Sequence, residues 1–395
     1  MTTVIGEGVV RDAYRRGQRK VVVDPQDIVT PQALDVFDRL GMRLLRAPAT
    51  PAPPLSTEPG RALSRTLYRR HPGFVPAVRQ SNISPVQIPR VAILGAHSLG
   101  SMLASLIAST GSATSVMLID LVPGLAERVA VDLEHARSLT GTSTRVFGGA
   151  DFSSLVGADV VVVAPESAGS LGPPNLVPML GETQMTGDAI ATYAPDAVVV
   201  FAGWPSEAFT TQLQRAGNLA PERVIGTGAT IASARLTNAL ASAANVSPAE
   251  VDAIAIGADG NYMCPLSAAR VRGRSLQDVL RPAEVNAALA VAADAPGYVQ
   301  SLRPSKPPAI APAHAALDVL QALRGARPGP IPVSVMVESC YNINKVVVGV
   351  TARLTLNGLQ SVVELPLASD ELAALQVAAD GVRRQTEELS ALLAE

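Results

Sequence analysis

The 395-residue chain is poor in cysteine, lysine and aromatic residues, with two cysteines, three lysines and an aromatic content of 3%. Two cysteines are too few for a disulfide scaffold, and neither Cys264 nor Cys340 has a nearby cysteine or histidine with which to form a metal site. No apolar run reaches the roughly 18 residues of a membrane-spanning helix. The N-terminus also lacks the basic-then-apolar order of a signal peptide. We therefore expect a cytoplasmic protein with no metal and no membrane contact.

Hydrophobic residues make up 48% of the chain and charged residues 17%, which excludes a disordered protein and suggests two or three domains. The net charge of −2 conceals an uneven distribution. Residues 1–90 carry 14 Lys+Arg against 7 Asp+Glu, whereas residues 91–395 carry 18 against 27. A basic N-terminal part therefore precedes an acidic body.

Residues 1–46 are predicted to form a small α/β unit. Lys20–Val23 has the composition of a short strand, and Thr30 followed by Pro31 is typical of a capped helix start. The helix should end at Gly41, and residues 42–45 could form a second strand. So short a unit is expected to dock on something.

Residues 47–90 are interpreted as a linker and a basic segment. Five prolines within residues 47–60 indicate a semi-rigid tether. The following segment, 61–90, has six arginines and no acid, three of them four residues apart: Arg61, Arg65 and Arg69. This is either a solvated basic face or a docking surface for an acidic protein partner or a phosphate. Nucleic acid is not expected as a partner, because no reading motif accompanies the arginines.

The pattern changes after residue 90. Apolar stretches with the length of buried strands alternate with helix-length stretches; they lie at residues 91–94, 115–119, 158–163 and 197–202. Such alternation predicts an α/β fold with a Rossmann-like, doubly wound parallel sheet. We assign residues 91–230 to a dinucleotide-binding domain and residues 231–395 to a substrate or C-terminal domain.

A dinucleotide-binding motif follows the first of these strands. Gly95 and Gly100 flank a turn that leads into an apolar helix, and Asp120 follows about 20 residues later. Asp120 would bind the two ribose hydroxyls, which favours NAD over NADP as the cofactor. His97 stands where the motif normally has its middle glycine, so its side chain either obstructs the pyrophosphate or contacts it as a cation.

The remainder of the chain resembles the lactate/malate dehydrogenase family from about residue 90 to residue 390. The segments that carry the resemblance are Val131–Ala136, Tyr193–Val200, Val224–Arg235, Ile256–Gly260, Pro332–Val335, Asn357–Gly358 and Val362–Leu367. The resemblance implies an α+β domain after the Rossmann-like one, hydride transfer between NAD and a 2-hydroxy acid, and a homo-oligomer. Residues 28–33 and the following Leu-Gly are faintly similar to bacterial microcompartment proteins.

At the positions that the family uses for catalysis, however, this sequence departs from the pattern. The proton-relay histidine is replaced by Asp259 and its aspartate partner by Ala232, while the carboxylate-binding arginine is kept as Arg235. Trp204 replaces the asparagine at the end of the fourth strand, where it should lie near the cofactor. No Lys, Arg or His occurs between residues 146 and 214, so the mobile-loop arginines are missing as well.

Two interpretations of Asp259 remain open. It is either a structural acid, paired with Arg235 or solvated in a loop, or a functional base whose pKa is raised by burial from about 4. Lys306 and His314 likewise either lie on the surface or, with Ile310, share a helix face toward the pocket.

These departures lead to two hypotheses of function. The favoured one is a non-catalytic, NAD-binding sensor or scaffold, because the relay pair and the loop arginines are missing together. The alternative is an NAD-dependent oxidoreductase that acts on an altered 2-hydroxy or 2-oxo acid, using Arg235 with Asp259, Lys306 or His314. Fold similarity alone cannot decide between them.

Overall fold

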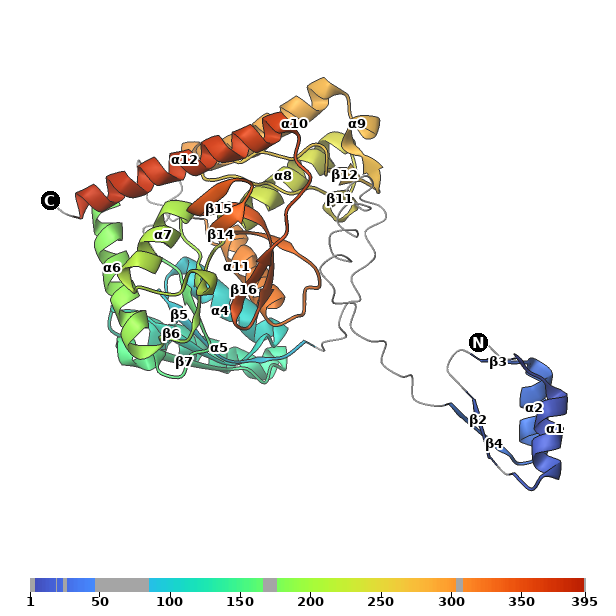
Figure 1. Cartoon of the computed structure of the whole chain (residues 1–395). Coiled ribbons are helices and arrows are strands. Elements are labelled where there is room, and N and C mark those ends of the chain that lie inside the picture. The colour runs from blue at the N-terminus through green and yellow to red at the C-terminus, as the bar shows by residue number, and fades with distance from the viewer. Residues whose placement is uncertain are drawn as a thin grey trace. The chain divides into compact units, whose positions relative to one another are not determined.

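The structure is a computed structural model that describes residues 4–18, 20–23, 27–46, 85–165, 176–302 and 308–393. The chain divides into two compact units, one ending at Pro76 and the other beginning at Ala77. Figure 1 labels most of the helices and strands of both units.

The N-terminal unit consists of two consecutive β-α-β segments. The first contains β1 (Val4–Ile5), α1 (Glu7–Arg15) and β2 (Lys20–Val23); the second contains β3 (Ile28–Val29), α2 (Pro31–Arg39) and β4 (Arg43–Arg46). Corresponding strands pair in parallel, β1 with β3 and β2 with β4. The unit is therefore an internal repeat, a feature that the sequence analysis did not detect.

The predicted strand at residues 20–23 and the predicted start of α2 are confirmed. Thr30 Oγ1 accepts a hydrogen bond from the N–H of Ala33 at 3.3 Å, as expected of a helix cap, and the chain then turns at Gly41 with φ of +60°. The unit has an apolar core of its own that includes Val10 and Phe37.

The body begins with a parallel sheet. Its elements in chain order are β5 (Ile88–Leu94), α4 (Ser98–Thr110), β6 (Ala113–Ile119), α5 (Leu125–Thr140), β7 (Arg145–Gly149), β8 (Val160–Val163), α6 (Leu176–Tyr193), β9 (Val198–Phe201), α7 (Ser206–Ala216) and β10 (Val224–Gly226). The strands lie in the order β7-β6-β5-β8-β9-β10, which confirms the doubly wound topology. The strand order reverses between β5 and β8, where such folds bind their ligands.

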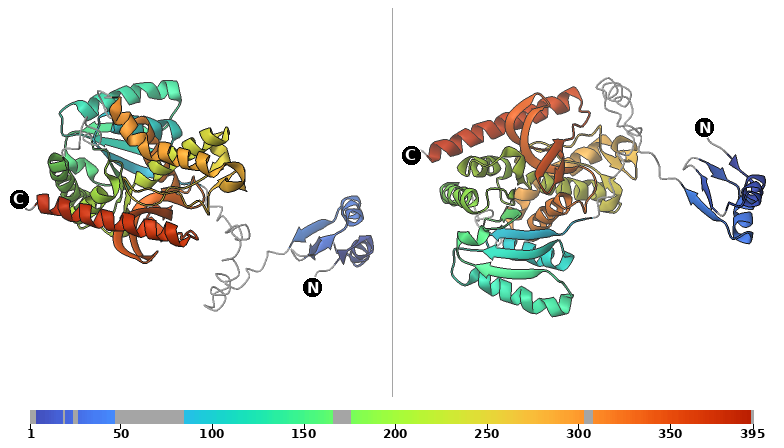
Figure 2. Two further views of the ribbon diagram at one scale, coloured as in Figure 1. Left: turned by 90° about the horizontal axis from the view of Figure 1, so that it is seen from above. Right: turned by 60° about the horizontal axis from the view of Figure 1, so that its bottom comes forward.

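The C-terminal part extends this sheet to nine strands. Its elements are α8 (Gly228–Ala244), β11 (Val251–Asp252), β12 (Arg270–Val271), β13 (Arg274–Ser275), α9 (Leu276–Val279), α10 (Pro282–Ser301), α11 (Ile310–Leu323), β14 (Ile331–Cys340), β15 (Ile343–Thr355), β16 (Gly358–Val362) and α12 (Ser369–Leu392). β14 pairs antiparallel with β10, and β15 and β16 follow as antiparallel neighbours. Figure 2 shows the long helix α12 along one side of the body.

The strands predicted from apolar runs are those buried on both faces. All four residues of β8 and of β9 are buried, which is why these strands appear in the sequence as continuous valine-rich runs. The edge strand β7 was missed because Val146 is its only buried residue.

Arg90, which the sequence analysis placed in the basic segment, belongs instead to β5. Its backbone N–H donates to the carboxylate of Asp159 at 2.8 Å and its guanidinium donates to the carbonyl of Ser154 at 2.8 Å. The proposed linker and basic segment up to residue 84, including Arg61, Arg65 and Arg69, lies outside the described residues.

Among the described residues, no helix is long and apolar enough to span a membrane, and no group of three or more His, Cys, Asp or Glu residues could hold a metal ion. Cys264 and Cys340 are both free.

We predict that removal of residues 1–60 leaves the melting temperature of the body nearly unchanged. The apolar core of the N-terminal unit contains only residues 5–44, and the cores of the body begin at Ile88, so neither core loses a described member when the other is removed. Calorimetry of the full chain and of the truncated one provides the comparison. An insoluble truncated protein, or one that melts many degrees lower, would show that the extension stabilises the body.

Candidate functional site

The turn between β5 and α4 requires glycine at both ends of its motif. Gly95 has φ of +100°, and a Cβ there would overlap the carbonyl oxygen of Ala164. A Cβ on Gly100 would overlap the carbonyl oxygen of Gly95. The first turn of α4 therefore lies directly against the strand, and the N-terminus of a helix in this position is where a pyrophosphate binds in this type of fold.

Asp120 follows β6 directly and is buried. Its Oδ2 accepts the N–H of Ala96 at 2.7 Å and its Oδ1 accepts the N–H of Val122 at 3.0 Å. A carboxylate has about four acceptor positions, so two remain for the hydroxyls of a ribose. The turn and Asp120 together fit a dinucleotide.

His97 lies beside this carboxylate. It precedes the first residue of α4 with φ of −71°, a backbone conformation that does not require glycine. Its Nε2 lies 3.7 Å from Oδ2 of Asp120, and its side chain is 32% exposed. His97 therefore lies in the turn expected to bind the pyrophosphate, and its imidazole also occupies space next to Asp120, the acid that would bind the ribose.

Trp204 comes shortly after β9, at the carboxyl end of the sheet, and is 36% exposed. Its peptide bond to Pro205 is cis. A large aromatic side chain thus stands at the edge where the ligands of doubly wound folds bind.

The loop that contains Asp259 is fastened to the start of α7. The N–H of Ser206 donates to Oδ2 of Asp259, and the N–H of Asp259 donates to Oε2 of Glu207 at 3.0 Å. Asp259 is itself half-buried. Its carboxylate therefore occupies an N-terminal capping position on α7, where a negative charge is favoured.

Glu207 is the central residue of this site, and the sequence analysis missed it. It lies in the first turn of α7 and is only 1% exposed. Its Oε1 accepts hydrogen bonds from the hydroxyls of Tyr262 and Ser334, the latter at 2.5 Å. The one sequence feature that could have indicated Glu207 is its place as an acid shortly after a buried strand. The residues that donate hydrogen bonds to it are far away in the sequence.

The N-terminus of α8 meets the same cluster. The N–H of Gly228 donates to Oγ of Ser206 at 3.0 Å, and the N–H of Ala229 donates to Oγ of Ser334 at 3.2 Å. A Cβ on Gly228 would lie 2.7 Å from Oε1 of Glu207, so only glycine leaves room for the acid. The N-termini of two helices therefore point into one buried polar cluster.

The electrostatic environment of Asp259 favours its neutral form. Burial and the neighbouring Glu207 raise the pKa of Asp259 well above its ordinary value, while the N–H of Ser206 and the charge of Arg235 act in the opposite direction. Burial and the same acids also raise the pKa of Tyr262, whose hydroxyl therefore stays protonated. Arg235 and Asp259 influence each other through space, but no direct ion pair joins these two described residues.

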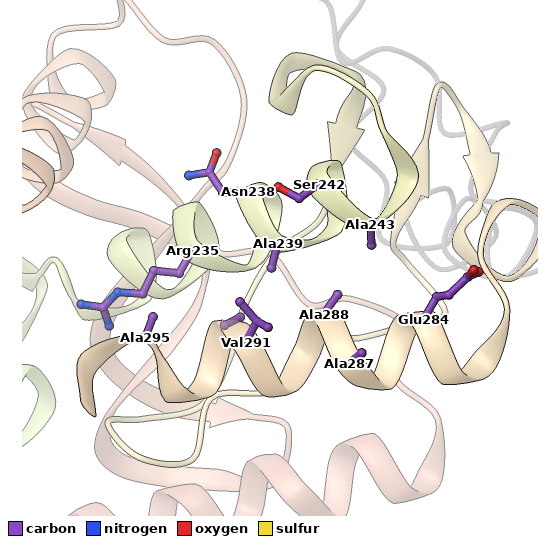
Figure 3. Close-up of a pocket in the computed structure, with 11 residues that line it drawn as sticks. Arg235, Asn238, Ala239, Ser242, Ala243, Glu284, Ala287, Ala288, Val291 and Ala295 are labelled. Atoms are coloured by element: carbon purple, nitrogen blue, oxygen red, sulfur yellow. The ribbon is translucent and has the colours of Figure 1, made fainter. Parts of the chain in front are cut away.

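Arg235 also lines a groove between α8 and α10, with a volume of about 610 Å³. Figure 3 shows Arg235 at one end of this groove and Glu284 at the other. Small apolar side chains, such as Ala239 and Ala288, form much of the wall between them.

The other predicted residues lie apart from the cluster. Ala232 is buried within α8 and supplies no acid. His314 and Ile310 are exposed on α11. Lys306 lies outside the described residues.

A doubly wound NAD-type domain followed by an antiparallel extension defines a class of two-domain dehydrogenase folds. Residues 89–226 match the NAD binding domain of lactate/malate dehydrogenase, and residues 229–392 match the alpha/beta C-terminal domain of the same family. The chain therefore belongs to the lactate/malate dehydrogenase family, and its cofactor is NAD.

Individual relatives agree with this assignment. The chain is 31% identical to the malate dehydrogenase of Trichormus variabilis over 307 residues, which cover 76% of this chain and 94% of that protein. The structure matches malate dehydrogenase from Aeropyrum pernix with a TM-score of 0.72 and 25% identity, covering 75% of this chain and 97% of that one. It also shares the fold of malate dehydrogenase from Cryptosporidium parvum, with a TM-score of 0.73, 23% identity, and coverage of 77% and 100%. None of these matches tests the resemblance of the N-terminal unit to microcompartment proteins.

We predict that His97→Gly binds NADH more tightly than the unmodified protein, because it frees space at the pyrophosphate turn and beside Asp120. Quenching of Trp204, the only tryptophan, provides the titration signal. His135→Gly, which removes an exposed imidazole from α5, is the control and should leave the affinity unchanged. Equal affinity of His97→Gly and the unmodified protein would contradict the proposed crowding.

Proposed function

We propose that this protein binds NAD(H) but does not oxidise lactate or malate, and acts instead as a dinucleotide-responsive sensor or scaffold. The observation that supports this proposal best is the environment of Asp259. At the position where the family has a proton-accepting imidazole, this chain has a carboxyl group held by the start of α7 and set against a second buried acid. Because these surroundings favour the protonated form of Asp259, the group is poorly suited to accept a proton.

The other departures support the same proposal. Ala232 cannot orient a base, and the absence of Lys, Arg and His between residues 146 and 214 removes the cation that would polarise a carbonyl group. Loss of one acid–base or electrostatic group costs on the order of 10²-fold in rate, and combined losses leave little activity.

A second proposal is an NAD-dependent oxidoreductase that acts on an altered 2-oxo or 2-hydroxy acid. The electrostatic coupling between Arg235 and Asp259 favours it, because a cation that could bind a carboxylate lies within reach of an acid that could transfer a proton. In this proposal Arg235 binds the substrate carboxylate and Asp259 transfers the proton.

We further propose that the protein forms a homo-oligomer in the cytoplasm. Exposed apolar side chains on two helices of the body support an interface between copies, namely Val131 and Leu139 on α5 and Val291 on α10. Leu139 is 89% exposed, which is unusual for a side chain in permanent contact with water. Light scattering should give a mass that is a multiple of the 40.8 kDa chain, and a purely monomeric solution would contradict the proposal.

For the N-terminal unit, we propose docking to an acidic protein partner through the basic residues of the segment 1–90. Its separate apolar core supports a role as an independent module. The truncation of residues 1–60 described above should then abolish capture of that partner at low salt.

We predict negligible turnover of lactate, malate, pyruvate and oxaloacetate with NAD(H). A steady-state assay should give kcat below about 1 s⁻¹, the lower end of the usual range for enzymes. The matched control is NADH binding by the same preparation, which shows that the cofactor site is intact. A kcat within the usual range would overturn the first proposal.

A further inference from the structure

The pair formed by Glu207 and Asp259 lies at the centre of the site, and neither residue belongs to the family pattern described above. The N–H of Asp259 donates to Oε2 of Glu207 at 3.0 Å, and Oδ2 of Asp259 accepts the N–H of Ser206, the residue next to Glu207, so the two acidic side chains lie side by side. Two neighbouring carboxylates, one of them fully buried, cannot both carry a full charge without a large electrostatic cost. We infer that Glu207 and Asp259 share a single proton at neutral pH, and that Glu207 is the positioning residue that keeps Asp259 protonated.

The hydrogen bonds indicate which acid carries the charge. Glu207 accepts three donors, the hydroxyls of Tyr262 and Ser334 and the N–H of Asp259. Ser334 is free to donate its proton because its oxygen already accepts the N–H of Ala229. Donors stabilise the ionised form of a carboxyl group, so the negative charge resides on Glu207.

The position of Glu207 in the first turn of α7 has the same effect, because the positive end of the helix dipole stabilises an anion there. From the described residues, the carboxyl group of Asp259 accepts a single hydrogen bond, from the N–H of Ser206 to Oδ2. Its other oxygen is left for the shared proton.

The remaining charged and titratable groups around Asp259 do not reverse this assignment. In the described part of the chain, the groups that act on this pair include Arg235 on α8 and Tyr262 in the same loop as Asp259. Arg235 is exposed, so solvent screens its attraction for the Asp259 carboxylate. Tyr262 keeps its proton and donates it to Glu207.

A protonated Asp259 can give a proton to a ligand oxygen but cannot accept one. For the oxidoreductase of the second proposal, this limits the acid–base role of Asp259 to the reduction direction, in which a carbonyl oxygen takes up a proton. That consequence rests on the second proposed function, whereas the shared proton does not depend on any activity.

The inference is tested by the pH dependence of thermal stability. Asp259 stays protonated in the folded state but ionises near pH ~4 when the chain is unfolded, so the folded state binds more protons above that pH. The stability of the folded protein therefore falls as the pH rises from ~4 toward the pKa of Asp259 in the folded state. We expect the melting temperature of the unmodified protein to decrease in this way with rising pH, and we expect the Asp259→Asn variant to lack the decrease. In Glu207→Gln it should be reduced, because Asp259 then ionises more readily.

Two variants separate this effect from simple damage. Ser334→Ala removes one donor but keeps both acids. Its melting temperature should be lower than that of the unmodified protein at every pH, and it should still decrease as the pH rises. Glu207→Asp keeps the charge and should restore part of the fall lost in Glu207→Gln. A curve for Asp259→Asn parallel to that of the unmodified protein would refute the shared proton, and a curve for Glu207→Gln parallel to it would refute the positioning role.

Infrared spectroscopy gives an independent measurement at neutral pH that needs no folded variant. The unmodified protein should show the carbonyl stretch of a buried protonated carboxyl group, shifted when labelled aspartate replaces the natural residue. Absence of such a band would overturn the inference even if Asp259→Asn failed to fold.

Discussion

The buried carboxylate of Glu207 holds the two domains of the body together at the site. It is contributed by α7 of the NAD-binding domain, but the hydroxyls that it accepts belong to Tyr262 and Ser334 of the C-terminal domain. A buried charge without its donors costs several kcal/mol, so each of these residues depends on the others. The absent Cβ of Gly228 is part of the same arrangement, because it leaves the space that Glu207 fills.

This network alters the chemistry available at the position of the family's proton relay. A histidine titrates near neutral pH without special surroundings, whereas a carboxyl group does so only when burial and a neighbouring charge raise its pKa. In this chain the second acid lies not on α8, where Ala232 stands, but at the start of α7. If Asp259 stands at the relay position, as the family resemblance implies, the structure places a second acid beside it from a different helix.

Most of the fold could be predicted from the sequence because its signals are local. Buried strands such as β8 and β9 are continuous apolar runs, and the turn at Gly95 is a short motif. The cluster around Glu207 could not be predicted in the same way, because Tyr262 and Ser334 are 55 and 127 residues away in the sequence. Asp259 was found only through the family resemblance, and its neighbour through the structure alone.

The glycine turn and the acidic cluster owe their residues to different constraints. Gly95 and Gly100 are required by the packing of the turn itself, since a Cβ at either position would overlap backbone atoms. Their presence therefore explains a dinucleotide-binding fold but says nothing about whether hydride is transferred. The acids at 207 and 259 lie outside that turn, and two neighbouring acids with a buried member are a costly way to fill space. Under the functions proposed above, it is therefore the protonation of Asp259, rather than the glycine turn, that distinguishes a dinucleotide-binding protein from an oxidoreductase.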